Sequence, residues 1–244
     1  MFEPALNDVL QRLDAAASAA QRPVPRLLAV SKTQPATAVA DLAATLRRVQ
    51  RDRIPAFGEN YVQEAAAKQA AMAEQGKALP ALEWHLIGHL QSNKAREAAR
   101  LFDWVQTVDR ASLVTALARH RPPEREPLNV LLQVNVDDEA SKHGCRPEEL
   151  AALADAVAGQ PRLRLRGVMV IPTPHADIEQ RRPAFRHARA LFDELRQRHP
   201  GIDTLSMGMS DDCAIAIAEG ATMVRVGTSL FGARPKPLAS DNPA

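Results

Sequence analysis

Cysteine and long apolar runs are both scarce in this sequence of 244 residues. Its two cysteines, Cys145 and Cys213, lie far apart, which excludes a disulfide framework and a cysteine-rich metal site and suits a reducing compartment. No stretch approaches the roughly 18 consecutive apolar residues of a membrane span. Acidic residues near the start, without a basic segment and an apolar run, predict an amphipathic helix and not a signal peptide. We therefore expect a soluble, cytoplasmic protein with no membrane contact.

The charge balance and the missing motifs exclude several further classes. The formal net charge is only +2, so no broad nucleic-acid surface is expected. The sequence lacks the G-x-S-x-G of serine hydrolases, the G-x-x-x-x-G-K-[ST] phosphate loop, and a G-x-G-x-x-G after a strand. His85 and His89 are four residues apart, but their segment is typical of a strand and a turn, so they would not share a helical face. We expect no metal, with His85 a hydrogen-bonded core residue and His89 a loop residue.

Strand-like and helix-like segments alternate along the chain. Apolar runs rich in β-branched residues are separated by longer segments with apolar residues three and four positions apart, and Gly159 stands where a helix would end. This alternation predicts an α/β fold with parallel strands. We expect a single (β/α)8 TIM-type barrel, with an N-terminal helix before it, over residues 1–233, and a flexible tail over 234–244. The expected strands are 26–32, 54–60, 82–88, 104–109, 129–136, 165–172, 204–210 and 223–231.

Lys32 ends the first of these runs. On strand alternation it shares a face with Leu28 and Val30, so an amine would close an otherwise apolar face. Functional residues of such barrels gather at the carboxyl ends of the strands. Desolvation there would lower the pKa of the amine and favour a nucleophile, whereas the alternative is a solvated lysine at a strand end.

Arg225 is a cation inside MVRVG, an otherwise apolar strand. A buried charge requires a partner. Arg225 would either point into the barrel mouth and donate to a ring nitrogen or an anion, or form a structural ion pair with Glu59 or Asp109.

Two glycine-containing segments end the last two runs. Ser210 is a candidate helix N-cap in SMGMSDD, and Gly227 and Thr228 lie in the end of the eighth run. Phosphate sites in barrels often lie at these two loops, where backbone N–H groups are available. Either segment alone fits an ordinary glycine turn, but the two together favour a phosphate site.

Seven ordered segments resemble the pyridoxal phosphate homeostasis proteins, the YggS/PROSC type. The resemblance covers almost the whole chain except the tail, and no matched position departs from it. Its most specific parts are LSMGMSDD and RVGTSLFGAR. The seven segments are AVSKTQP (29–35), FGENYVQE (57–64), WHLIGHLQSNK (84–94), NVDDEASKHG (135–144), LRGVMVIP (165–172), LSMGMSDD (205–212) and MVRVGTSLFG (223–232).

This resemblance implies a barrel like the N-terminal domain of alanine racemase, with pyridoxal 5′-phosphate (PLP) as the cofactor on Lys32. It implies that Ser210 and Gly227–Thr228 contact the phosphate and that Arg225 lies near the pyridine nitrogen. The complete set of residues implied around the cofactor is Lys32, Asn60, Met169, Met207, Ser210, Arg225, Gly227 and Thr228.

Three functions are compatible with these sequence features. The leading hypothesis is a PLP-binding carrier or regulator, not an established enzyme, that affects vitamin B6 and amino-acid balance and delivers PLP to apo-enzymes. A PLP-dependent amino-acid racemase is the alternative, but it requires a second base. The chain has one tyrosine, Tyr61, and no residues left for a second domain, so we expect a monomer. A phosphate-sugar enzyme with a Lys32 Schiff base fits the loops but not the family motifs. The 141–144 loop would either close over the site or remain a surface loop.

Overall fold

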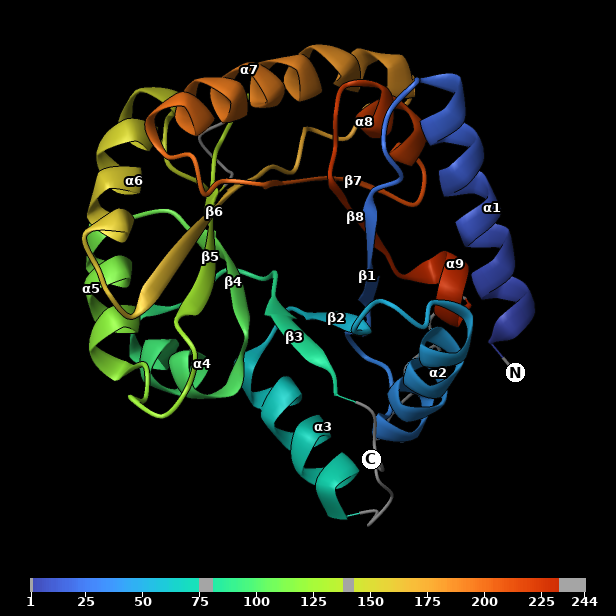
Figure 1. Cartoon of the computed structure of the whole chain (residues 1–244), viewed down its shortest axis with the longest axis horizontal. Helices are drawn as coiled ribbons and strands as arrows, with labels where there is room; N and C mark the ends of the chain where they lie inside the picture. Colours follow the sequence, from blue (N-terminus) through green and yellow to red (C-terminus); the bar gives the residue numbers. More distant parts are fainter. Residues whose placement is uncertain (1, 75–80, 138–142, 233–244) are drawn as a thin grey trace, which may run out of the picture.

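The computed structural model describes residues 2–74, 81–137 and 143–232. Within them, eight parallel strands close into one barrel in which each strand pairs with its neighbours in chain order (Figure 1). The predicted TIM-type fold is therefore confirmed. The strands are β1 (Arg26–Val30), β2 (Ala56–Glu59), β3 (Glu83–Leu86), β4 (Trp104–Val108), β5 (Leu128–Gln133), β6 (Leu163–Met169), β7 (Thr204–Met209) and β8 (Met223–Val226).

The helices form a ring around the barrel (Figure 1). They are α1 (Glu3–Ala19), α2 (Ala36–Val49), α3 (Val62–Glu74), α4 (Ala95–Leu101), α5 (Ala111–His120), α6 (Leu150–Ala158), α7 (Arg182–Arg198), α8 (Cys213–Ala218) and α9 (Thr228–Phe231), with 3-10 turns η1 (Ser92–Lys94), η2 (Pro147–Glu149) and η3 (Ile178–Arg181). None of the described helices combines the length and the apolar character needed to cross a bilayer. Gly159 caps α6 as predicted.

The N-terminal helix α1 packs against the last two helices of the barrel. Its buried residues are Leu6, Val9, Leu13 and Ala17, which recur at helical spacing and form one apolar stripe. This stripe contacts α8 and α9, so α1 closes the layer beside β7 and β8. The predicted amphipathic helix therefore supports the two loops that were expected to bind phosphate.

Strand alternation divides the core into two compartments. The larger apolar cluster lies between strands and helices, while the barrel interior holds smaller clusters such as Trp104 with Leu131 and Met169. The interior also contains a polar chain: the Gln106 amide bonds Nδ1 of His85 at 2.9 Å, and the Ser206 hydroxyl donates to Gln106 Oε1 at 2.8 Å. His85 is thus the hydrogen-bonded core residue that was predicted, and burial lowers its pKa.

The eighth apolar run contains a strand and a helix. The run over 223–231 was predicted as one strand, but β8 ends at Val226 and α9 begins at Thr228 after Gly227. A Cβ on Gly227 would lie 3.3 Å from the carbonyl oxygen of Val30, tighter than most contacts. The loop after β8 therefore passes close to the end of β1, which brings it towards the Lys32 turn.

Candidate functional site

Lys32 lies two residues beyond the end of β1, half-buried at the carboxyl end of the barrel. Both of its neighbours are held by carboxylates: the Ser31 hydroxyl donates to Glu59 Oε1 at 2.5 Å, and the Thr33 backbone N–H donates to Glu64 Oε1 at 2.5 Å. Thr33 has a φ of 65°, in the left-handed region that a β-branched residue rarely adopts. The turn that carries Lys32 is therefore held in a conformation that the free chain would avoid.

A buried ion-pair network lies under this turn. The Lys68 ammonium, on α3, donates to Glu59 Oε1 at 2.6 Å, to Glu64 Oε1 at 3.1 Å and to the Ser31 carbonyl at 2.8 Å. Burial raises the pKa of Glu59, against the hydrogen bonds from Lys68 and Ser31 that lower it. Its second oxygen, Oε2, is buried and has no hydrogen-bond partner among the described residues. The network fixes the turn and leaves one buried acceptor beside it.

Lys68 was missed at the sequence level, although the sequence carried a signal for it. It falls on the buried face of α3, in step with Val62, Ala65 and Met72. A lysine on an apolar helical face, four residues after Glu64, indicates a buried ion pair. Lys68 is hydrogen-bonded to two carboxylates and a carbonyl, so its role is structural. Lys32, in contrast, lies at the barrel mouth after β1.

Arg225 is buried inside the barrel and is bonded to neutral groups. Its guanidinium donates to the carbonyl and hydroxyl oxygens of Ser206, each at 2.9 Å, and to the Val170 carbonyl at 2.9 Å. The proposed ion pair with Glu59 or Asp109 is wrong, because Glu59 pairs with Lys68 and Asp109 with Arg110. Burial lowers the pKa of Arg225 to about 10, so it remains a cation at neutral pH.

The strand register places Arg225 between β1, which precedes the Lys32 turn, and β7, which precedes the Ser210 loop. It pairs with Leu28 of β1 on one side and with Met209 of β7 on the other. The end of β8 therefore lies between the Lys32 turn and the Ser210 loop. The contact of Arg225 with a pyridine nitrogen stays a prediction.

The loop after β7 differs in detail from the sequence prediction. Ser210 does not cap α8, which begins at Cys213 with Asp212 at the N-cap position. Asp212 instead accepts from the Met209 backbone N–H at 2.6 Å and from Arg181 at 2.6 Å, and so it closes the turn around Ser210. Because the Asp212 carboxylate already accepts a backbone hydrogen bond in this turn, the Ser210 hydroxyl is not required as the cap of α8.

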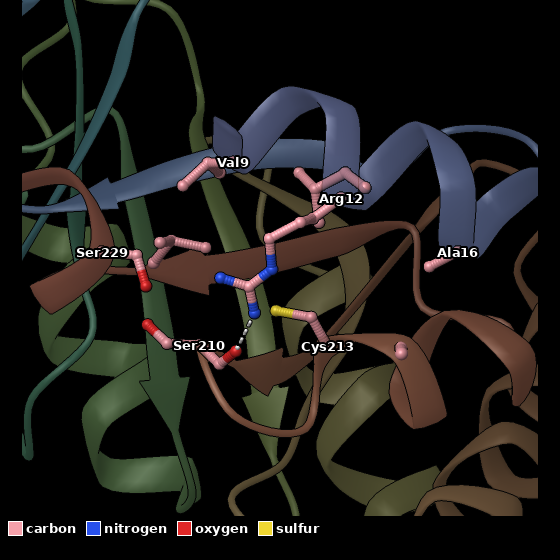
Figure 2. A pocket seen from close by; sticks show the side chains of 9 residues that line it. Val9, Arg12, Ala16, Ser210, Cys213 and Ser229 are labelled. Carbon is pink, nitrogen blue, oxygen red and sulfur yellow. Dashed lines mark hydrogen bonds between the residues drawn. The ribbon is translucent and has the colours of Figure 1, made fainter. Parts of the chain in front are cut away.

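Arg12 of α1 lies behind both expected phosphate loops. Its guanidinium donates to the Ser210 carbonyl at 3.1 Å. Figure 2 shows the same guanidinium directed between Ser210 and Ser229, with Cys213 beside it. These residues line a cavity of about 50 Å³ between α1, α8 and the start of α9. Arg12 and Ser229 were both missed at the sequence level, because only the fold brings the first helix to the last two loops.

The other predicted cofactor residues lie in different environments. Asn60 follows β2 and is half-buried at the barrel mouth, and Met169 lies in the barrel interior with Trp104. Met207 is fully buried in the larger apolar cluster, and its expected place near the cofactor stays a prediction. Ser206 takes the inward position on β7, and strand alternation sends the next side chain outwards.

We predict that replacing Arg12 weakens the binding of PLP but not that of pyridoxal, which lacks the phosphate. Loss of one exposed cation near a phosphate is worth about 1 kcal/mol, or roughly a five-fold weaker Kd for Arg12→Gln. Titrations of both ligands against Arg12→Gln and against Arg119→Gln, an exposed arginine on α5, measure the difference. Equal losses for PLP and pyridoxal would show that Arg12 has no role specific to the phosphate.

Comparison with known proteins agrees with this architecture. The family of the alanine racemase N-terminal domain matches residues 5–235. The pyridoxal phosphate homeostasis protein of Pseudomonas aeruginosa is 54% identical over 209 residues, 85% of this chain and 84% of that protein. Its Escherichia coli counterpart is 51% identical over 208 residues, 85% of each chain.

Solved structures give the same result. PipY of Synechococcus elongatus with PLP bound is 39% identical, with a TM-score of 0.76 over 92% of this chain and 100% of that one. Alanine racemase of Clostridium difficile has a TM-score of 0.65 at 15% identity, over 94% of this chain and 58% of the racemase, and so shares the fold alone. Fold and loop geometry thus define the class, a barrel of the alanine racemase N-terminal-domain type. Within it, the chain belongs to the family of pyridoxal phosphate homeostasis proteins.

Proposed function

We propose that this protein holds PLP as a Schiff base on Lys32 and acts as a carrier or regulator in cellular vitamin B6 and amino-acid homeostasis. The observation that carries the proposal is the convergence of Lys32, Arg225 and the Ser210 and Gly227 loops at the ends of the adjacent strands β1, β8 and β7. The PLP-bound structure of PipY and the names of the relatives support it.

The residues at the barrel mouth fit the three reactive parts of PLP. Lys32 offers an amine for the aldehyde, while Ser210 and Thr228 offer hydroxyl and backbone donors for the phosphate, with the positive charge of Arg12 behind them. Arg225 is a buried cation whose bonded partners are neutral, which suits an unprotonated ring nitrogen. When bound, PLP supplies an electrophilic aldehyde and an electron-accepting ring.

The charge on Arg225 also limits what chemistry the site can support. A protonated pyridine nitrogen beside a guanidinium would place two positive charges together, so the nitrogen stays unprotonated. The ring is then a weaker electron acceptor, and removal of a substrate proton is disfavoured. This favours storage of the cofactor over turnover.

A racemase is the second candidate, and it depends on the shared fold. Racemisation requires a proton donor on the face of the substrate opposite the lysine. Tyr61, the one tyrosine, follows β2 with 64% of its surface exposed, in a position that faces solvent. Tyr61 is therefore poorly placed to act as the second base opposite Lys32. We propose a monomeric, cytoplasmic carrier that passes PLP to apo-enzymes.

One experiment with two readouts separates carrier from racemase. PLP-loaded protein is incubated with L-alanine in deuterated water and, separately, with an apo-enzyme that requires PLP. We expect no Lys32-dependent exchange of the alanine α-hydrogen, because the ring is a weak electron acceptor. We expect activation of the apo-enzyme faster than by an equal concentration of free PLP.

The control for both readouts is Lys32→Ala. Exchange that is above the rate of free PLP and is lost in Lys32→Ala would establish the racemase and contradict the carrier. Activation no faster than with free PLP would remove delivery from the proposal.

A further inference from the structure

A second group of reactive side chains lies at the barrel mouth, away from Lys32. His89 follows β3, Asp109 follows β4, and His143 precedes η2 in the connection after β5. One ligand atom from each residue lies within 4.8 Å of the others. These residues belong to the sector of β3, β4 and β5, across the barrel from β8 in Figure 1. The predicted separation of His85 from His89 is confirmed, but His89 instead meets an imidazole from a distant loop.

His89 is held by a fixed turn. The carbonyl of the preceding Gly88 accepts from the Thr107 hydroxyl at 2.8 Å. The following residue, Leu90, is buried, and its carbonyl accepts from Arg110 at 2.9 Å. The backbone on both sides of His89 is therefore tied to the end of β4, while its imidazole remains exposed.

Asp109 is oriented by Arg110. The guanidinium of Arg110 donates to Asp109 Oδ1 at 2.6 Å and to the Ser92 hydroxyl at 3.1 Å. Asp109 Oδ2 lies 3.9 Å from His89 Nδ1. A second residue that fixes the direction of a carboxylate is the usual support of a metal ligand.

His143 is fastened to the end of β5. Its carbonyl accepts from the Gln133 amide at 3.1 Å, and the Cys145 N–H donates to the Gln133 carbonyl at 2.9 Å. Between them Gly144 has a φ of 127°, and a Cβ there would lie 2.7 Å from the Asn135 nitrogen. Only glycine fits this return of the chain, which delivers His143 to the barrel mouth.

The two imidazoles are stacked on each other. Their ring centroids are 3.8 Å apart with an angle of 15° between the planes. This stacking brings one ring nitrogen of each imidazole within 4.8 Å of a carboxylate oxygen of Asp109.

We propose that His89, Asp109 and His143 bind a divalent first-row transition metal of the Zn²⁺ type. Two imidazoles and one carboxylate suit these ions, whereas Mg²⁺ and Ca²⁺ prefer oxygen ligands alone. Tetrahedral bonds of about 2.0–2.1 Å place neighbouring ligand atoms roughly 3.4 Å apart, so rotation of the exposed rings completes the geometry. The fourth position would hold water or an anion. The positive charge of Arg110 would moderate the affinity.

The test is a titration of the full chain with Co²⁺, followed by visible absorption, and then with Zn²⁺ in competition. We expect one saturable equivalent, displaced by Zn²⁺. Its affinity should fall at least ten-fold in His143→Ala and in His89→Ala, and should be unchanged in His187→Ala, an exposed histidine on α7. His143 is exposed, so its variant should unfold at the wild-type temperature.

Three results would overturn the proposal. These are no saturable Co²⁺ binding by the wild type, equal losses in His143→Ala and His187→Ala, and retention of the equivalent in both His89→Ala and His143→Ala. PLP binding is measured on the same samples. Because the ligands lie in another sector from Lys32, failure of metal binding with normal PLP binding would leave the proposed function intact.

Discussion

Lys32→Ala should abolish covalent attachment of PLP and the visible absorption that accompanies it. The remaining contacts, from the phosphate loops and Arg225, would still hold the cofactor weakly. We expect Kd to rise by at least about 100-fold, equivalent to roughly 2.8 kcal/mol. Absorption spectra and equilibrium titration of wild type and variant measure both effects.

The matched control is Lys94→Ala, at the turn after β3. Lys94 is partly exposed and ion-paired with Glu97 at 3.8 Å, so its loss should leave PLP binding unchanged. The Lys32 side chain is half-buried and contributes little to the apolar core. Its alanine variant should therefore keep the wild-type unfolding temperature. A yellow Lys32→Ala protein with an unchanged Kd would contradict the assignment.

Lys68→Met should cause the largest loss of stability among single substitutions near the site. It leaves Glu59 buried with no counter-charge, and removal of one partner of a buried ion pair costs about 3–5 kcal/mol. It also frees the Ser31 carbonyl, so the turn that carries Lys32 should loosen and PLP binding should weaken. Urea unfolding with and without PLP measures both consequences.

The loss of folding stability caused by Lys68→Met should depend on pH in a defined direction. Burial raises the folded-state pKa of Glu59 above its ordinary value of 4.5, and removal of Lys68 raises it further. A raised carboxyl pKa favours the folded state at low pH, and this stabilisation is lost as the pH rises through the folded-state pKa. The variant should therefore be closest to wild type in mild acid.

The double variant Glu59→Gln, Lys68→Met is the control for this explanation. It removes the unpaired charge, so it should recover part of the stability and lose most of the pH dependence. If the double variant is less stable than Lys68→Met at neutral pH, the buried charge is not the cause. Lys94→Met should change the free energy of unfolding by no more than about 0.5 kcal/mol.

The sequence predicted the barrel because alternation of strands and helices is a local pattern repeated along the chain. The prediction was wrong where one apolar run contains two elements. At Gly227, β8 is followed directly by α9. The prediction was also wrong where the chain offers a competing polar group, as at Ser210, whose turn is closed by Asp212.

The convergence of the candidate site residues was predictable because strand ends converge in any parallel barrel, while their contacts with PLP stay predictions. Lys32, Arg225 and the two loops follow from that rule and from the family motifs. Which face Met207 occupies depends on the inward position taken by Ser206, and sequence alone did not establish it. The meeting of His89 with His143 depends on the path of a long connection, which leaves no local pattern.

The most direct test of the account is chemical trapping of PLP on the wild-type protein. Reduction with borohydride fixes the cofactor on the lysine that holds it, and peptide mass mapping identifies that lysine. We predict one modified peptide, with the cofactor on Lys32 at the end of β1. Modification of another lysine in place of Lys32, or no fixed cofactor in protein that was yellow before reduction, would contradict the account.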